Sequence, residues 1–347
     1  MSIMFEADRH NFGKCVERIE RASGHWYRKP RSVYWEHLFF GQGSPIKSLF
    51  YSAGPNGDRP LCEYLFNLNV EVKNDWLGFS EEVSGNEVPI SIEHFYSFGV
   101  LVGYCYLLGV RDLHKYNLVV KKNHLQIIDA EVVLTNLILP NETILLPFRE
   151  IPFDLSAVSL LCSNLKKLSV SQIEKLFSGY FDIATAILDS LDVITPVLEH
   201  ECRNQHPARV ILKNTKQYRD FLMGNGSAND YLPEELVQLD RGDIPYFFKY
   251  VGQTGLYFLS EPDLVETVSN MPSDLDRDVS RHSKPPALLL QTHVAVAKKV
   301  ATGALYLRKA LGSNAPIHLQ DTNGEIAFSD SSLSFRHQSF STSPRAI

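Results

Sequence analysis

The chain has 347 residues, of which 44% are hydrophobic and 21% charged, and its formal net charge is −6. These values are ordinary for a globular protein, and the length suffices for one large two-lobed domain or two small ones. Because the chain is acidic and has no long basic stretch, we expect no nucleic-acid partner.

The cysteines and the first residues bear on the compartment. The five cysteines are scattered, and none follows residue 202. A small, odd number is typical of a reducing compartment, and no cluster of Cys and His predicts a zinc site. The start of the chain, MSIMFEADRH, is acidic and short of apolar residues, unlike a secretory signal. We therefore expect a cytoplasmic protein, with export without a cleaved signal left open.

The first part of the chain mixes strand-like runs with polar breaks. This pattern predicts a small β-rich N-lobe over residues 1–85. Residues 84–89 (SGNEVP) are rich in turn formers and are interpreted as a hinge. A larger, mainly helical C-lobe is expected over residues 86–261, which makes the predicted fold α+β with two lobes.

Two apolar segments predict buried helices in the larger lobe. Residues 95–110 (FYSFGVLVGYCYLLGV) are uncharged for sixteen residues. A membrane span needs about 20, so we expect a buried helix and no span. Residues 170–198 carry apolar side chains at helical spacing, and this stripe is expected in the core.

Between these helices lies the most informative segment, residues 111–131 (RDLHKYNLVVKKNHLQIIDAE). Two β-prone runs, 118–120 and 125–128, flank a polar turn and predict a hairpin. A turn centred on Asn123 makes Asn117 face Asp129, with their Cα atoms roughly 4.5–5.5 Å apart. Side-chain oxygens placed in this way can share one Mg²⁺ ion. A buried helix, an Asp loop, an Asn and a later Asp occur in the same order in protein kinases.

The C-terminal part is expected to be an accessory region. Residues 262–327 are predicted to form a helical extension, in which 262–285 are a polar, proline-containing loop and 287–310 an amphipathic helix. Residues 328–347 are rich in serine and are predicted to be a mobile tail.

Several short motifs together resemble the dehydratase domain of class II lanthipeptide synthetases, which has a divergent kinase-like fold. They occur in the family's order over about residues 5–260. The matching segments are 8–13 (DRHNFG), 26–32 (WYRKPRS), 112–117 (DLHKYN), 128–131 (IDAE), 154–157 (DLSA), 209–215 (RVILKNT) and 242–247 (GDIPYF).

The resemblance implies that ATP phosphorylates a Ser or Thr of a peptide. In that reaction Lys29 pairs with the ATP phosphates, and Asp112 accepts or orients the proton of the acceptor hydroxyl. His114 supports the loop or the phosphate. Asn117 and Asp129 hold Mg²⁺, which neutralises charge on the transferring group.

The resemblance also implies a second step, in which phosphate is eliminated to leave a dehydroamino acid. Arg209 and Thr215 belong to this half, together with Asp8 and His10. Arginine suits phosphate because its planar fork donates two parallel hydrogen bonds. Lys213 stands where the family has a second arginine, so it retains a phosphate-binding charge without the fork.

Alternatives stay open for individual residues and for the whole protein. Glu131 is either a second metal ligand or a charge at the end of the hairpin. Neither the long N-terminal extension nor the zinc cyclase domain of the family is visible, so we expect a separate cyclase or activator as a partner. An enzyme that only phosphorylates a protein partner is a second interpretation, and a binding module without catalysis is a third.

Overall fold

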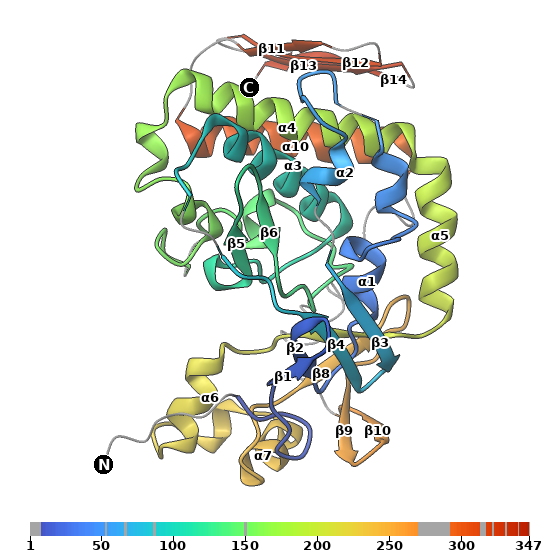
Figure 1. Cartoon of the computed structure of the whole chain (residues 1–347), viewed down its shortest axis with the longest axis vertical. Helices are drawn as coiled ribbons and strands as arrows, with labels where there is room; N and C mark the ends of the chain where they lie inside the picture. The colour runs from blue at the N-terminus through green and yellow to red at the C-terminus, as the bar shows by residue number, and fades with distance from the viewer. Residues whose placement is uncertain are drawn as a thin grey trace.

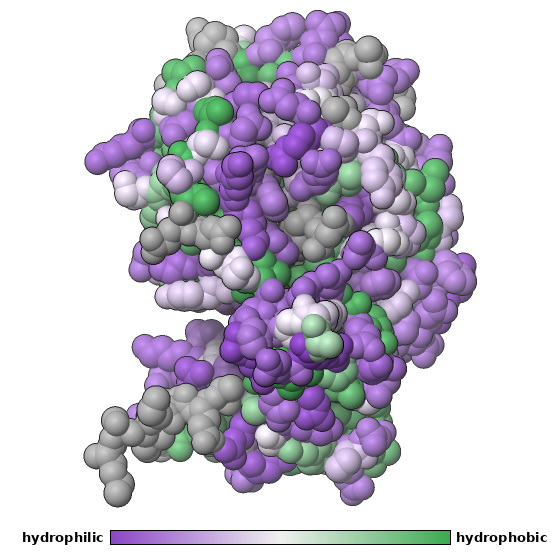
Figure 2. Space-filling model, viewed as in Figure 1, coloured by the Kyte–Doolittle hydropathy of each residue, from purple (hydrophilic) through white to green (hydrophobic). Residues whose placement is uncertain are grey.

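The computed structural model describes residues 8–52, 54–65, 68–85, 88–148, 151–269, 292–312, 317–320, 323–329, 332–338 and 340–346. The fold is α+β, as predicted, with helices packed in one large core and several small antiparallel sheets around it (Figure 1). The face seen in Figure 2 is mainly hydrophilic and is indented between the upper helical part and the lower part.

The N-terminal sheet has the strand order β1-β2-β4-β3. Its strands are β1 (Glu17–Arg21), β2 (Gly24–Lys29), β3 (Val70–Asn74) and β4 (Leu77–Glu81). Between β2 and β3 the chain forms α1 (Tyr34–Phe40) and α2 (Leu61–Tyr64), whose apolar side chains join the main hydrophobic core. Strand β2 ends in Lys29, which is thereby carried to the boundary between sheet and core.

The core is built on two closely packed helices, α3 (Ile92–Leu108) and α4 (Val170–Asp189). Helix α3 is buried from His94 to its end, as its uncharged sequence predicts. Added Cβ atoms at Gly99 and Gly179 would lie 2.0 and 2.1 Å from carbonyl oxygens of the opposite helix, so only glycine permits this approach. No helix in the described ranges is both long and apolar enough to cross a membrane.

Two further helices complete this part, α5 (Leu191–Arg203) and α10 (His293–Leu311). Figure 1 shows α10 alongside α3 and α4, and α5 descending toward the lower part. The helix expected at 287–310 thus begins at His293 in the described structure. The preceding residues 270–291, which include most of the expected loop, lie outside the described residues.

A second small sheet lies below the helical core, with the strand order β10-β9-β8-β7. It consists of β7 (Pro207–Val210), β8 (Phe247–Tyr250), β9 (Tyr257–Glu261) and β10 (Leu264–Thr267), accompanied by α6 (Thr215–Leu222) and α7 (Pro233–Asp240). Its apolar side chains form hydrophobic clusters of their own. The expectation of a loop from residue 262 is wrong for β10, because Pro262 and Asp263 form a two-residue hairpin turn between paired strands.

The C-terminal segment forms a third sheet instead of a mobile tail. Strands β11 (Ile317–Gln320), β12 (Gly324–Phe328), β13 (Ser332–His337) and β14 (Phe340–Ala346) pair in sequence order. Alternation makes Leu333, Phe335 and His337 face inward. Phe335 packs on Phe181 of α4, and the buried His337 is 2.9 Å from Asp189. The serine content concealed this alternating apolar pattern.

Candidate active site

The loop after α3 holds Asp112 in an unusual backbone conformation. Gly109 ends the helix with a φ of 71°, and Asp112 itself has a φ of 63°. Backbone hydrogen bonds fix both neighbours, from Arg111 to Val132 (2.8 Å) and from Leu113 to Thr143 (2.9 Å). The structure thus fixes the backbone of Asp112 in a sparsely populated region, which aspartate adopts more readily than most residues.

The environment of Asp112 suits a proton acceptor. Burial raises the pKa of its carboxyl to about 7, with Arg209 acting in the opposite direction. A general base works best when its pKa lies near the pH at which the reaction runs. Asp112 therefore combines a fixed position with a pKa matched to proton transfer near neutrality.

The predicted hairpin is confirmed, but its predicted register is wrong. Strands β5 (Leu118–Val120) and β6 (Leu125–Ile127) pair with Leu118 opposite Ile127, one residue away from the expected register. The cause is a tighter turn, closed by a hydrogen bond from Lys121 N–H to the His124 carbonyl (2.8 Å). Asn117 consequently faces Ile128, whose N–H donates to the Asn117 carbonyl.

Asn117 and Asp129 nevertheless line the same cavity. Asn117 lies in a 3-10 turn before β5, so strand alternation does not decide its direction. Its side-chain amide donates to the Asp112 carbonyl (2.8 Å), an arrangement that leaves the amide oxygen for another partner. The two predicted metal ligands therefore line one cavity although the hairpin pairs Asn117 with Ile128 and not with Asp129.

Lys29 lies at the centre of a buried charge network. Its ammonium group donates to Glu36 and to Asp129, both at 2.9 Å, and to the Ile128 carbonyl at 3.2 Å. Burial opposes its charge, but the carboxylates of Asp129 and Glu36 outweigh this and raise the pKa of Lys29. Glu36 lies on α1 and is 1% exposed. A lysine on a strand that is paired with a glutamate on a helix is an arrangement required in active protein kinases.

Arg31 links this pair to the rest of the site. It donates to Glu36 at 3.0 and 3.1 Å and also bonds to Asp129. Burial favours protonation of Asp129, yet the charges of Lys29 and Arg31 outweigh it and hold the pKa of this carboxyl far below its usual range. Asp129 therefore stays ionised, as a metal ligand must.

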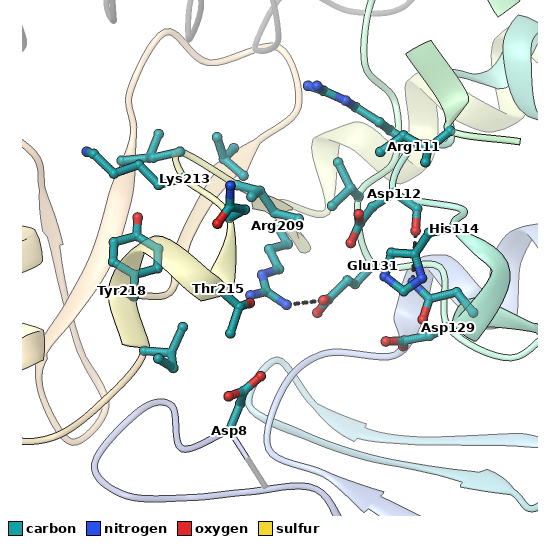
Figure 3. Close-up of a pocket in the computed structure, with 18 of the residues that line it drawn as sticks. Asp8, Arg111, Asp112, His114, Asp129, Glu131, Arg209, Lys213, Thr215 and Tyr218 are labelled. Carbon is teal, nitrogen blue, oxygen red and sulfur yellow. Dashed lines mark hydrogen bonds and ion pairs between the residues drawn. The ribbon is translucent and has the colours of Figure 1, made fainter. Parts of the chain in front are cut away.

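A cavity of about 790 Å³ collects the predicted site residues (Figure 3). Its walls come from the loop that carries Asp112, the end of the hairpin, β7, the start of α6 and the N-terminal segment. All the predicted residues except Lys29 line it, namely Asp8, His10, Asp112, His114, Asn117, Asp129, Arg209, Lys213 and Thr215. Lys29 lies behind Asp129, in contact with it.

One wall of the cavity, here called the Arg209 side, consists of β7 and the start of α6 and carries Arg209 and Thr215. Arg209 on β7 bonds to the carboxylate of Glu131, and its guanidinium lies 5.2 Å from the ring centre of Tyr246. In Figure 3 the Arg209 side chain lies between Thr215 and Glu131. Thr215 is the first residue of α6, whose first turn lines the cavity. A helix N-terminus favours anions, and here the Gln217 N–H is already capped by the Asn214 side chain.

Lys213 is committed elsewhere in this structure. Its ammonium group donates to both oxygens of Glu235, at 2.8 and 2.9 Å, and lies 5.0 Å from the ring centre of Tyr231. Glu235 has no exposed side-chain surface and also accepts from Tyr218. Lys213 thus lines the cavity with its charge paired to Glu235, and its expected phosphate-binding role stays a prediction.

The N-terminal element is anchored by the segment that contains the predicted GDIPYF motif. The buried carboxylate of Asp243 accepts from the N–H groups of Phe12 and Gly13, both at 2.8 Å. His10 Nδ1 lies 2.7 Å from the Ile244 carbonyl, and Asp8 is paired with Arg219 at 2.7 Å. These contacts hold both predicted N-terminal residues at the cavity.

His10 and His114 are both neutral near physiological pH. Burial, helped by the charge of Arg209, lowers the pKa of His10. Because the Ile244 carbonyl can only accept, Nδ1 of His10 carries the proton and Nε2 keeps a lone pair. Burial also lowers the pKa of His114, whose buried Nδ1 has no hydrogen-bond partner among the residues that the structure describes.

The donor set suits a magnesium ion held jointly with phosphate. Asn117 and Asp129 supply oxygen donors at one cavity, and the Asp129 side chain is 34% exposed. The described residues contain no group of three or more His, Cys, Asp or Glu residues that would enclose a metal. Mg²⁺ is usually bound by one or two protein groups with phosphate oxygens and water, so two ligands fit it.

The sequence alone had not identified Glu36 as part of the site. The available signal was a lone carboxylate in the largely aromatic and apolar run YWEHLFF, shortly after Lys29. A charged residue in such a run is buried only with a partner, and this one has two. The role of Glu131 between two arginines could not be inferred from sequence either.

In a comparison with known protein families, one family model matches the first part of the chain. Residues 2–157 match the model of a family described as a domain of unknown function (DUF4135). No curated protein matches the chain. The segment that carries Lys29, Asp112, Asn117 and Asp129 is therefore similar to DUF4135 domains.

Proposed function

We propose that the protein is an ATP- and Mg²⁺-dependent phosphotransferase of the lanthipeptide-dehydratase type, acting on a Ser or Thr hydroxyl of a peptide or protein. The observation that carries this proposal is that Asp112, Asn117 and Asp129 line one cavity, while the buried pair of Lys29 and Glu36 is bonded to Asp129 from behind. We further propose that the Arg209 side of the same cavity eliminates the phosphate afterwards.

In the first step the oxygen of the acceptor hydroxyl attacks the γ-phosphorus of ATP, while Asp112 takes the proton of that hydroxyl. The bond from that phosphorus to the bridging oxygen breaks, and ADP leaves with the electron pair. Magnesium held by Asn117 and Asp129 would supply charge neutralisation for the phosphates. Lys29 orients the nucleotide phosphates, and Glu36 orients Lys29.

In the second step a base removes the α-proton of the phosphorylated residue. The electrons of that C–H bond form the Cα–Cβ double bond, and the Cβ–O bond breaks to release phosphate with its electron pair. His10 is the base we assign, because its Nε2 lone pair belongs to a neutral ring at the cavity. Arg209 and the start of α6 stabilise the departing anion.

The pairing of Lys213 with Glu235 favours a second candidate, an enzyme that phosphorylates its substrate without eliminating the phosphate. One experiment separates the two. The protein is incubated with ATP, Mg²⁺ and a pool of Ser- and Thr-containing peptides, and the masses of the peptides and of the protein itself are measured. Loss of one water supports the two-step reaction, whereas gain of one phosphate alone supports the second candidate. If neither the peptides nor the protein change in mass, both candidate functions are refuted.

Arg209→Ala sharpens this test. If Arg209 stabilises the departing phosphate, the variant accumulates phosphorylated peptide where the wild type makes dehydrated peptide. A variant that yields only dehydrated product would remove Arg209 from the second step.

A further inference from the structure

The carboxylate of Glu131 lies between two arginines. Its Oε1 accepts from Nη1 of Arg209, and its Oε2 lies 2.8 Å from Nε of Arg31. The second contact is an ion pair whose N–H direction is not aligned for a hydrogen bond. The Glu131 side chain is only 9% exposed, so both oxygens are committed to arginines within the protein.

This arrangement decides between two functions for Glu131 that sequence leaves open. Asp129 and Glu131 are two residues apart and both line the cavity. Asp129 meets Lys29 and Arg31 through Oδ1 and its side chain is 34% exposed, whereas Glu131 is 9% exposed and meets Arg209 and Arg31 through its two different oxygens. A metal bound by Glu131 would have to displace two guanidinium groups from it and bring a like charge close to both.

The same contacts fix Arg209 from two directions. Its backbone N–H donates to the Glu131 carbonyl at 3.2 Å, which joins β7 to the segment after the hairpin. The Glu131 carboxylate holds one edge of the guanidinium, and the ring of Tyr246 lies 5.2 Å away. A guanidinium has five N–H donors, so holding one edge leaves others for a phosphate in the cavity.

We infer that Glu131 is a positioning residue that holds Arg209 toward the cavity, and that it is not a ligand of the metal. The inference rests on the proposed function, because that function supplies the phosphate that Arg209 would bind. Glu131 also contacts Arg31, but Glu36 and Asp129 still hold Arg31 when that contact is lost. Removing the charge of Glu131 should therefore alter the fate of the phosphate through Arg209 and leave the metal requirement unchanged.

The test compares the wild type with Glu131→Gln, Arg209→Ala and the double variant, using ATP, Mg²⁺ and the best peptide from the pool. Two quantities are measured, namely the Mg²⁺ concentration for half-maximal ATP consumption and the ratio of phosphorylated to dehydrated product. Glu82→Gln is the matched control, because Glu82 pairs with Arg18 at 2.7 Å outside the cavity.

We expect Glu131→Gln to raise the product ratio at least tenfold while the Mg²⁺ requirement stays within about twofold of wild type. Adding Glu131→Gln to Arg209→Ala should change the ratio no further, because the two residues act as a unit. A tenfold higher Mg²⁺ requirement, or additive effects in the double variant, would overturn the inference. Glu131→Asp keeps the charge but shortens the side chain, and it replaces Glu131→Gln if that variant does not fold.

A third measurement keeps this inference separate from the elimination step. Arg209 is labelled with phenylglyoxal, and its modification is followed by mass spectrometry. If Glu131 holds Arg209, the labelling rate rises at least fivefold in Glu131→Gln but not in Glu82→Gln. An unchanged rate refutes the positioning role, whereas absence of dehydrated product in the wild type refutes only the second step of the proposed function.

Discussion

Replacing Glu36 by glutamine tests the charge network on which the site is built. The Glu36 carboxylate accepts from Lys29 at 2.9 Å, from Arg31 at 3.0 and 3.1 Å and from the Ala130 N–H at 3.2 Å. The whole network contains three cations and three carboxylates, namely Lys29, Arg31 and Arg209 with Glu36, Asp129 and Glu131. Glu36→Gln keeps the shape of the side chain and leaves one buried positive charge unbalanced.

Burial sets the size of the effect. Removing one partner of a buried ion pair costs about 3–5 kcal/mol, and an amide that still accepts hydrogen bonds places the loss near the lower end. If the free energy of unfolding falls by about 2 kcal/mol per molar urea, the urea concentration at the unfolding midpoint should fall by roughly 1.5 M. An exposed pair contributes about 0–1 kcal/mol by comparison.

Urea unfolding followed by tryptophan fluorescence measures this change. The three tryptophans are Trp26, Trp35 and Trp76, which all lie in the first 85 residues, where Glu36 lies. The control is Glu63→Gln, because the Glu63 side chain is 51% exposed and 3.8 Å from Arg59. Equal midpoints for the two variants would refute the argument that Glu36 balances buried charge.

Three further outcomes are expected. Asp129→Asn should abolish phosphorylation because it removes the charged metal ligand, and wild-type turnover in that variant would exclude this role. The value of kcat/KM for phosphorylation should rise about tenfold from pH 6 to pH 8, because burial raises the pKa of Asp112 to about 7 and only its ionised form accepts a proton; a flat profile would contradict the assignment. Asp243→Ala should lose about 2–3 kcal/mol of stability and speed tryptic cleavage after Lys14, because the N–H groups of Phe12 and Gly13 lose their acceptor; unchanged cleavage would contradict this.

Local patterns predicted the framework of the site well. The uncharged run that forms α3, the loop with Asp112 and the hairpin of β5 and β6 follow from hydrophobicity and turn residues that are close in sequence. The hairpin register was missed by one residue, because a polar run specifies that a turn occurs without specifying how many residues it contains. The C-terminal strands were missed because serine content masked an alternating pattern.

The amino-acid sequence by itself determined which chemical groups the site contains, and in which order the chain presents them. Only the tertiary structure decided which charges meet, since Lys29 reaches Asp129 across a hundred residues and Asp243 holds the chain at Phe12. It also turned Lys213 toward Glu235 and Glu131 toward Arg209. The physical reason is that a buried charge is stable only beside a partner, and the folding of distant segments, which no local pattern encodes, selects that partner.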